Sequence, residues 1–216
     1  MKKVICFSLW GDNPKYTIGA IKNADLALQL YPHWICRYYI GKSVPDEIIQ
    51  KLKNKSNTEI IIMQEEGNWD GMFWRFYAAS DPSVGVMMSR DTDSRLSERE
   101  KLAVDEWLES DKDFHIMRDH PAHATPILGG MWGARNRILF NFYDLIQDQD
   151  KGNYWQVDQD FLKNKIYPLV KDNSLVHDEF FENKPFPTPR KEGLDHEGNP
   201  ENFVGEPVDE NDVRIR

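Results

Sequence analysis

Residues 84–95 read VGVMMSRDTDSR, an apolar run that passes directly into two aspartates separated by one residue. A short continuous apolar run is typical of a strand buried on both faces of a sheet. If the chain is still extended where the run ends, the side chains of Asp91 and Asp93 point in the same direction. Two carboxylates placed in this way suit a hard divalent cation such as Mn²⁺ or Mg²⁺. A solvated turn at the end of the strand is the alternative interpretation.

The segments on either side of this stretch alternate between strand-like and helix-like patterns. Apolar runs predict strands at residues 4–10, 34–40, 59–63, 84–89 and 114–117. Apolar side chains at helical spacing predict helices at residues 14–28, 71–79, 97–107, 134–145 and 161–170. This order predicts an α/β fold with a mostly parallel central sheet flanked by helices. Ligands of such sheets bind beyond the carboxyl ends of the strands, which is where Ser8, Asp91 and Asp93 fall.

Residues that favour helix starts mark three of the expected helices. Asn13 precedes Pro14, a residue well suited to the first position of a helix. Ser97 and Glu100 have the spacing of a capping box, in which the two side chains satisfy backbone N–H groups of the first turn. Ser43 is expected to cap a further short helix.

The length and the composition predict one main domain. The chain has 216 residues, 40% of them hydrophobic, which suits a single core with or without an extension. From about residue 183 onward, prolines interrupt a polar, acidic sequence without periodicity. We therefore expect a domain over residues 1–182 and a proline-rich acidic arm over residues 183–216. The arm is expected either to be partly disordered or to be held against the domain by Phe186 and Phe203.

Charge and cysteine content narrow the range of partners and compartments. The 27 basic and 36 acidic residues give a net charge of −9, which argues against nucleic acid and against anionic membranes. No run approaches the roughly 20 apolar residues that span a bilayer. Cys6 and Cys36 both lie in strand-like runs, which indicates buried thiols and a reducing compartment. We therefore expect a soluble cytoplasmic protein without a nucleic-acid partner or a membrane span.

Two aspartates one residue apart after a fourth strand resemble the D-x-D motif of the GT-A glycosyltransferases, which are nucleotide-diphospho-sugar transferases. The resemblance implies the GT-A fold, a nucleotide-sugar donor with UDP as the expected nucleotide, and a divalent cation, Mn²⁺ or Mg²⁺. It also implies that the acceptor is a hydroxyl on a glycan or on another molecule. In that family the first strand and its loop, here Ser8, Leu9 and Trp10, hold the base and the ribose.

Two arginines and a glycine pair extend the resemblance. Arg75 lies in the predicted helix before the aspartates, where a basic residue of the family often meets the donor or the D-x-D motif, and Arg95 follows them. Both are candidate partners for the acidic or phosphate groups, and surface ion pairs are the alternative. Gly129 and Gly130 resemble the glycine-containing donor or acceptor loop of the family. Adjacent glycines let backbone N–H groups approach a ligand, and a tight turn is the alternative.

The stretch that begins with Asp158, Gln159 and Asp160 resembles the D-Q-D-x-L-N signature of retaining enzymes related to glycogenin and the lipooligosaccharide galactosyltransferases. Lys163 stands where that signature has its asparagine, and Asn164 follows one place later. The resemblance implies that Asp158 or Asp160 binds a sugar hydroxyl or is the catalytic carboxylate. It also implies that Gln159 lies near the anomeric carbon. Helix capping by Asp158 is the alternative interpretation.

A histidine near the end of the predicted domain completes the resemblance. His177 resembles the downstream histidine that finishes the metal site in those relatives, so the implied metal ligands are Asp91, Asp93 and His177. A purely structural histidine is the alternative. The resemblance follows the motif order over residues 1–180, and the chain looks most similar to small viral glycosyltransferases, including those of the large algal viruses. For a viral protein the expected location is the host cytoplasm.

Two other functions fit the same residues. A metal-dependent hydrolase would use a two-metal site that activates water, built from Asp91, Asp93, His120, His123 and His177. A nucleotide-sugar-binding module without activity would keep the pocket but not the reaction. The segment RDHPAH at residues 118–123 fits either a polar loop or an acceptor pocket, with Asp119 or His120 touching sugar hydroxyls.

Overall fold

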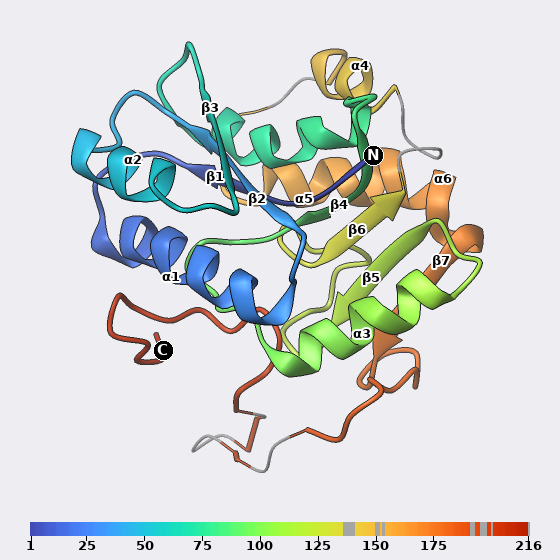
Figure 1. The fold of residues 1–216 in the computed structure, drawn as a ribbon. Coiled ribbons are helices and arrows are strands. Elements are labelled where there is room, and N and C mark those ends of the chain that lie inside the picture. The colour runs from blue at the N-terminus through green and yellow to red at the C-terminus, as the bar shows by residue number, and fades with distance from the viewer. Residues whose placement is uncertain are drawn as a thin grey trace.

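A computed structural model describes residues 1–135, 141–149, 152, 154–190, 193–194, 198–199 and 201–215 of the protein. Within these residues a seven-stranded sheet runs through the centre of the molecule, in the order β3-β2-β1-β4-β6-β5-β7 (Figure 1). The strands are β1 (Lys2–Leu9), β2 (Ile35–Ile40), β3 (Thr58–Ile62), β4 (Val84–Ser89), β5 (Phe114–Arg118), β6 (Trp132–Arg135) and β7 (Ser174–Asp178).

The sheet is mostly parallel, with one strand reversed. β1 pairs in parallel with β2 and β4, and β2 pairs in parallel with β3. β6 is antiparallel to both β4 and β5, whereas β7 is parallel to β5. Because β6 runs opposite to β4, Trp132 at its start lies beside Ser89 at the end of β4. The residues just before β6 therefore lie at the same edge of the sheet as those just after β4.

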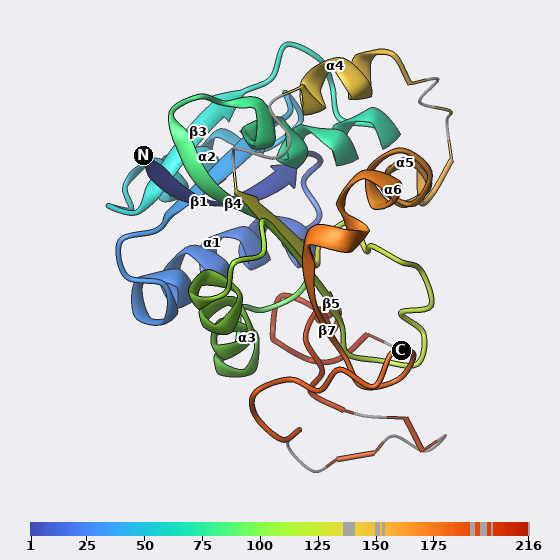
Figure 2. The ribbon, with the colours of Figure 1, turned by 90° about the vertical axis from the view of Figure 1, so that its right-hand side faces the viewer.

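Helices cover both faces of the sheet (Figure 2). One face carries α1 (Pro14–Leu30), α2 (Asp46–Lys53) and α3 (Glu98–Glu109). The other face carries the 3₁₀ helix η1 (Trp69–Ser80), α4 (Phe142–Gln147), α5 (Val157–Phe161), the π-helical turn η3 (Leu162–Ile166) and α6 (Tyr167–Val170). A 3₁₀ turn, η4 (Lys171–Asn173), leads into β7. In the described part of the chain, no helix is both long enough and apolar enough to cross a membrane. The predicted α/β architecture is confirmed.

Two of the three predicted helix caps are present. The Asn13 side chain accepts a hydrogen bond from the first turn of α1, and the Ser97 hydroxyl accepts one from the first turn of α3. The predicted cap at Ser43 is wrong, because α2 begins after Pro45 without a side-chain cap. The Ser43 hydroxyl instead accepts a hydrogen bond from the N–H of Gly11, 2.7 Å away. It therefore ties two loops together rather than starting a helix.

Small side chains let α1 lie close to the sheet. Its fully buried apolar residues are Ala20, Ala24 and Ala27, whereas the larger Leu28 is 47% exposed. Short side chains shorten the distance between a helix and the surface it covers, since the packed layer between them is thinner. The predicted helix is confirmed, but the face that it buries is one of small residues.

The stretch predicted as a helix over residues 134–145 is the clearest error. Residues 132–135 form β6, and α4 begins only at Phe142, while residues 136–140 lie outside the described residues. Strand β6 fills the gap between β4 and β5, so backbone pairing on both sides outweighs local helical spacing. The helix predicted at residues 71–79 is present as the 3₁₀ helix η1, and the pattern at residues 174–178 is a strand, β7, that we did not predict.

The arm is extended, and its described residues pack against the domain rather than away from it. Phe186 and Val204 are buried in a small apolar cluster with Ala103, Met117 and Met131. Figure 1 shows the arm running along one end of the sheet toward α1. Phe203, the other side chain expected to hold the arm, lies against the His120 ring with the ring centroids 4.3 Å apart.

Candidate functional site

A cavity of about 680 Å³ opens at the edge of the sheet where β1 and β4 end. Its walls come from the end of β1, the first turn of α1, η1, the loop before β6, the start of α5 and the arm. The turn formed by Asp91, Thr92 and Asp93, called the D-x-D turn below, completes them. The polar and charged lining of the cavity includes Ser8, Arg75, Asp91, Asp93, Asp158 and Gln159. The volume lies in the range of cavities that hold small molecules and cofactors.

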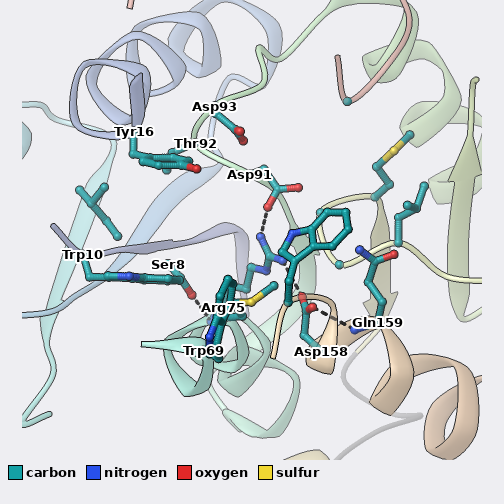
Figure 3. Close-up of a pocket in the computed structure, with 18 of the residues that line it drawn as sticks. Ser8, Trp10, Tyr16, Trp69, Arg75, Asp91, Thr92, Asp93, Asp158 and Gln159 are labelled. Atoms are coloured by element: carbon teal, nitrogen blue, oxygen red, sulfur yellow. Dashed lines mark hydrogen bonds and ion pairs between the residues drawn. The ribbon is translucent and has the colours of Figure 1, made fainter. Parts of the chain in front are cut away.

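Arg75 forms the centre of this cavity wall. Its buried guanidinium makes ion pairs with Asp91 and with Asp158, whose Oδ2 is 2.8 Å from Nη2 (Figure 3). Burial raises the pKa of the Asp158 carboxyl above its usual value, and the Arg75 charge offsets part of that rise. The planar guanidinium fork is suited to holding two carboxylates in fixed directions. Arg75 therefore links the D-x-D turn to the start of α5.

Asp93 has a different cation for its partner. Its Oδ2 is 2.8 Å from Nζ of Lys15, in the first turn of α1. Burial and the neighbouring Asp91 charge raise the pKa of Asp93, and Lys15 offsets part of this rise. The backbone carbonyl of Asp93 accepts a hydrogen bond from the N–H of Val208 in the arm, at 2.7 Å. The second aspartate is thus fixed by α1 on one side and by the arm on the other.

Glycine is required where the backbone meets these charged groups. A Cβ atom on Gly130 would lie 2.0 Å from Oδ2 of Asp91, and one on Gly129 would lie 2.3 Å from Oδ2 of Asp158. The Ser89 hydroxyl donates a hydrogen bond to the Gly129 carbonyl, at 2.6 Å, which holds the loop against the end of β4. Any side chain on the glycine pair would displace the carboxylates from the positions that Arg75 gives them.

The structure brings most of the predicted site residues into one cavity. Its lining includes ten of them: Ser8, Leu9, Trp10, Arg75, Asp91, Asp93, Gly129, Gly130, Asp158 and Gln159. The Ser8 hydroxyl accepts a hydrogen bond from the backbone N–H of Arg75, at 3.0 Å. This bond joins the end of β1 to η1, so the segment expected to hold a nucleotide borders the charged cluster directly.

Three predicted residues lie elsewhere. His177 does not line the cavity, because one ring nitrogen is 2.8 Å from His115 and the other faces Glu106 at 3.5 Å. Asp160 accepts a hydrogen bond from the Tyr154 hydroxyl at 2.9 Å and is not part of the lining. Arg95 holds the arm instead of a ligand, since its guanidinium bonds the carboxylate of Asp212 at 2.7 Å. We therefore leave His177 out of the metal site that is considered below.

The two-metal site of the hydrolase alternative does not assemble. His120 and His123 pack against each other and against Phe203, with ring centroids 5.8, 4.3 and 5.4 Å apart. Among the residues that the structure describes, no group of three or more histidines, cysteines and acidic residues is arranged to hold a metal. The residues of this alternative are all described. Asp91, Asp93 and His123 line the cavity, whereas His177 faces His115 and Glu106 away from it.

Several residues that line the cavity were not predicted as part of a site. Tyr16, Trp69, Trp155 and Gly205 come from four different segments, and two of them are among the seven tryptophans of the chain. His123, from the segment that we considered for an acceptor pocket, lines the cavity as well. Gly205 lies in the arm, and only long-range packing brings the arm to the cavity. Burial lowers the pKa of His123 to about 4, so this imidazole is neutral near pH 7.

The aspartate pair fits a divalent cation that is shared with a ligand. Each carboxylate uses one oxygen for its ion pair, Oδ1 of Asp91 with Arg75 and Oδ2 of Asp93 with Lys15. The second oxygen of each makes no ion pair with any described residue. Mg²⁺ in particular is often held by one or two carboxylates together with substrate phosphates and water. Asp91 and Asp93 supply that number of ligands, with room in the cavity for the others.

Comparisons with known proteins place the fold. No protein-family model matches the chain, and no curated protein matches it either. Its structure is similar to a glycosyltransferase involved in the glycosylation of the major capsid of PBCV-1, with a TM-score of 0.55 and 14% identity over 83% of each chain. The chain has the GT-A fold.

Two further structures are similar over most of the GT-A domain. Glucosyl-3-phosphoglycerate synthase from Mycobacterium tuberculosis, in complex with Mn²⁺, UDP and glucosyl-3-phosphoglycerate, has a TM-score of 0.52 and 12% identity over 81% of this chain and 68% of its own. 4-diphosphocytidyl-2C-methyl-D-erythritol synthase from Anaerococcus prevotii has a TM-score of 0.55 and 10% identity over 87% of this chain and 93% of its own. At these identities the similarity establishes the fold, and the activity must be argued from the site.

Proposed function

We propose that this protein is a glycosyltransferase that moves a sugar from a UDP-sugar to a hydroxyl acceptor with the help of a divalent cation. The observation that carries the proposal is the cluster in which Arg75 joins Asp91 to Asp158, next to Asp93, in one cavity of a GT-A fold. Asp91 and Asp93 offer carboxylates for a cation, and Gln159, next to Asp158, offers an amide for a sugar. The proposal is further supported by the similarity in fold to a glycosyltransferase that binds Mn²⁺ and UDP.

The nucleotide is assigned to the end of the cavity formed by β1 and α1. Ser8, Trp10 and Tyr16 lie together there, beside the D-x-D turn (Figure 3). Aromatic rings and a partly buried hydroxyl suit a base and a ribose. The diphosphate would then lie at Asp91 and Asp93, which would hold the cation. When bound, Mn²⁺ or Mg²⁺ supplies positive charge that offsets the charge developing on the departing diphosphate.

The start of α5 is assigned to the reacting sugar. Both carboxylate oxygens of Asp158 are engaged, Oδ2 by Arg75 at 2.8 Å and Oδ1 by the backbone N–H of Gln159 at 2.9 Å. Asp158 therefore acts as a positioning residue that fixes the first turn of the helix. The Gln159 side chain lines the cavity and offers an amide that can both donate and accept hydrogen bonds with sugar hydroxyls.

The substitution Asp93→Asn tests the proposal. Removing one of two cation ligands should lower cation-dependent UDP release from a UDP-sugar by at least about 100-fold, because a cation at the leaving group stabilises the transition state by several kcal/mol. Turnover would be measured with Mn²⁺, with Mg²⁺ and with chelator. The surface variant Asp105→Asn in α3 serves as the control, since Asp105 lies outside the cavity lining and pairs with Lys101 one turn away. Unchanged cation-dependent turnover in Asp93→Asn would contradict the proposal.

The same variant should not lose stability. The pKa of Asp93 in the folded protein is raised by burial and by Asp91, so the fold disfavours the ionised carboxylate. A carboxyl whose pKa is higher in the folded than in the unfolded protein stabilises the fold while it is protonated. This contribution to the free energy of unfolding is present below the pKa of the unfolded chain and is lost as the pH rises through the pKa of the folded protein. At pH 7, Asp93→Asn should therefore unfold at the same denaturant concentration as the wild type or at a higher one. This separates lost chemistry from lost folding.

A further inference from the structure

Two tryptophans that line the cavity have no part in the proposed nucleotide and cation sites. Trp155 is 66% exposed and Trp69 is 37% exposed, and both line the cavity. Trp69 opens η1 and Trp155 precedes α5, two elements that contact each other on the same face of the sheet. Figure 3 shows Trp69 on the side of the cavity where Arg75 and Asp158 lie. Large aromatic side chains exposed around a cavity indicate a surface that binds a ligand.

The backbone on both sides of Trp155 is held in place. The Tyr154 hydroxyl donates a hydrogen bond to Asp160 at 2.9 Å. Gln156 has a left-handed backbone, with φ of 71°, and its carbonyl accepts hydrogen bonds from the N–H groups of Gln159 and Asp160, both at 3.0 Å. A non-glycine residue adopts this conformation at an energetic cost. The exposed indole therefore projects from an anchored support rather than from a freely moving loop.

The charges around the cavity decide which kind of ligand this surface accepts. Among the described residues that line the cavity, Arg75 is the one permanent cation, and both of its ion pairs are with carboxylates of the site. The His123 imidazole, with its pKa lowered to about 4 by burial, carries no charge near neutral pH. The remaining charged lining is acidic. The cation proposed at Asp91 and Asp93 would be taken up by the diphosphate of the donor. No cationic side chain of the described lining is then left for an anionic acceptor, which the acidic lining would repel.

The uncharged part of the lining suits a sugar ring. Gln159 presents an amide, and Met72 and Leu128 add apolar surface beside the tryptophans. One face of a pyranose ring is a patch of C–H groups that stacks on an indole, while its edge carries hydroxyls that pair with amides. An alkyl chain would use the apolar surface but not the amide.

We propose that the acceptor is an uncharged sugar whose ring stacks on Trp155, and that this residue determines acceptor specificity. The inference rests on the proposed function. In the reaction, the acceptor hydroxyl oxygen forms a bond to the anomeric carbon while the bond from that carbon to the diphosphate oxygen breaks. The diphosphate leaves with the bonding electron pair, and the hydroxyl proton is released to water.

The experiment compares Trp155→Ala, Trp155→Phe and the control Tyr143→Ala, which removes an exposed aromatic ring of α4 outside the cavity lining. Each protein is assayed for UDP release without acceptor and for transfer to neutral methyl glycosides, to sugar phosphates and to a serine-containing peptide. Trp155→Ala should raise the KM for neutral methyl glycosides about tenfold, the loss expected for one stacking contact. Trp155→Phe, which keeps an aromatic ring, should bring the KM most of the way back to the wild-type value. In both variants, UDP release without acceptor should stay within about twofold of the wild type.

Four outcomes overturn the inference. The first is a wild type that prefers sugar phosphates or the peptide to neutral glycosides. The second is a Trp155→Ala variant with an unchanged KM for the glycoside. The third is a Trp155→Ala variant that loses UDP release and transfer equally, which would place the indole on the donor. The fourth is a wild type that neither binds UDP with Mn²⁺ nor releases it from any UDP-sugar, which overturns the proposed function as well and is distinguished by that donor assay.

Discussion

Asp91 and Asp119 each follow a strand of the same sheet, β4 and β5, yet they are surrounded very differently. The Asp119 carboxylate is fully buried and accepts hydrogen bonds from Arg99, from Arg190 and from the backbone N–H of Val204, at 2.8–2.9 Å. The Asp91 side chain is 43% exposed, and its one ion pair with the described residues is that with Arg75. Asp91 leaves one oxygen open to the cavity, whereas both oxygens of Asp119 are bonded, by Arg99 of α3 and by Arg190 and Val204 of the arm.

The difference shows how to tell a binding carboxylate from a structural one. Both aspartates come directly after a buried strand, so sequence position alone does not separate them. What separates them is saturation, because a carboxylate whose oxygens are fully hydrogen-bonded by protein has nothing left for a ligand. By this criterion Asp119 does not touch sugar hydroxyls, which corrects one of the two interpretations of residues 118–123. From the same segment, His123 does line the cavity.

The largest expected effect comes from removing the guanidinium of Arg75, which joins Asp91 to Asp158. Arg75→Met leaves the Asp158 carboxylate buried without a counter-ion, which should cost about 3 kcal/mol of unfolding free energy at pH 8. Turnover should fall at least about 100-fold, because Asp91 also loses its support. The pKa of Asp158, already raised by burial, rises further without Arg75, so the variant takes up a proton more readily as the pH falls.

This pH dependence gives Arg75→Met a specific signature. The folded variant should hold a carboxyl of raised pKa, so its stability relative to the wild type should recover as the pH falls from 8 toward 5. Chemical denaturation at several pH values measures this difference. Arg75→Lys keeps the charge without the planar fork, and it should lie between the two proteins. A deficit that is the same at every pH would mean that Asp158 is not the group left unpaired.

The next effect separates the two aspartates directly. Asp119→Asn removes the charge opposite Arg99 and Arg190 but keeps one acceptor oxygen, so it should cost about 2 kcal/mol of stability. Turnover measured at low temperature, where the variant is folded, should stay within about threefold of the wild type. Asp91→Asn should show the reverse, with stability within about 1 kcal/mol and turnover greatly reduced. If both variants lose turnover equally, the distinction between the two carboxylates is wrong.

The smallest expected effect tests how closely the backbone approaches the cluster. Gly130→Ala places a Cβ 2.0 Å from Oδ2 of Asp91, so the carboxylate must turn aside, and turnover should fall about tenfold. Gly85→Ala is the matched control, because it lies at the other end of β4 and its Cβ meets only the Cβ of Met1 within 3 Å. Parallel assays of cation-dependent UDP release compare the two, and equal activity would show that Asp91 is less constrained than the geometry implies.

Local signals predicted much of the fold and of the cavity. The apolar run before Asp91 and the cap at Asn13 depend on neighbouring residues alone, and both are confirmed. Strand β6 was missed because its conformation is set by pairing with β4 and β5, which its own spacing does not reveal. His177 follows the expected order along the chain, but its ring packs between His115 and Phe186, away from the cavity. Motif order fixes position along the chain and says nothing about the direction of a side chain.

One wall of the cavity joins the beginning of the chain to its far end. Gly205 lines the same space as Ser8, and the N–H of Val208 bonds the carbonyl of Asp93. Contacts between segments so distant in sequence form only after a large loop closes, and the entropy of that closure is lost before the contacts can compensate for it. We therefore expect this wall to form late during folding. Any ligand that binds only the finished wall then shifts the equilibrium toward the native chain by mass action, and protects the arm together with the rest of the domain.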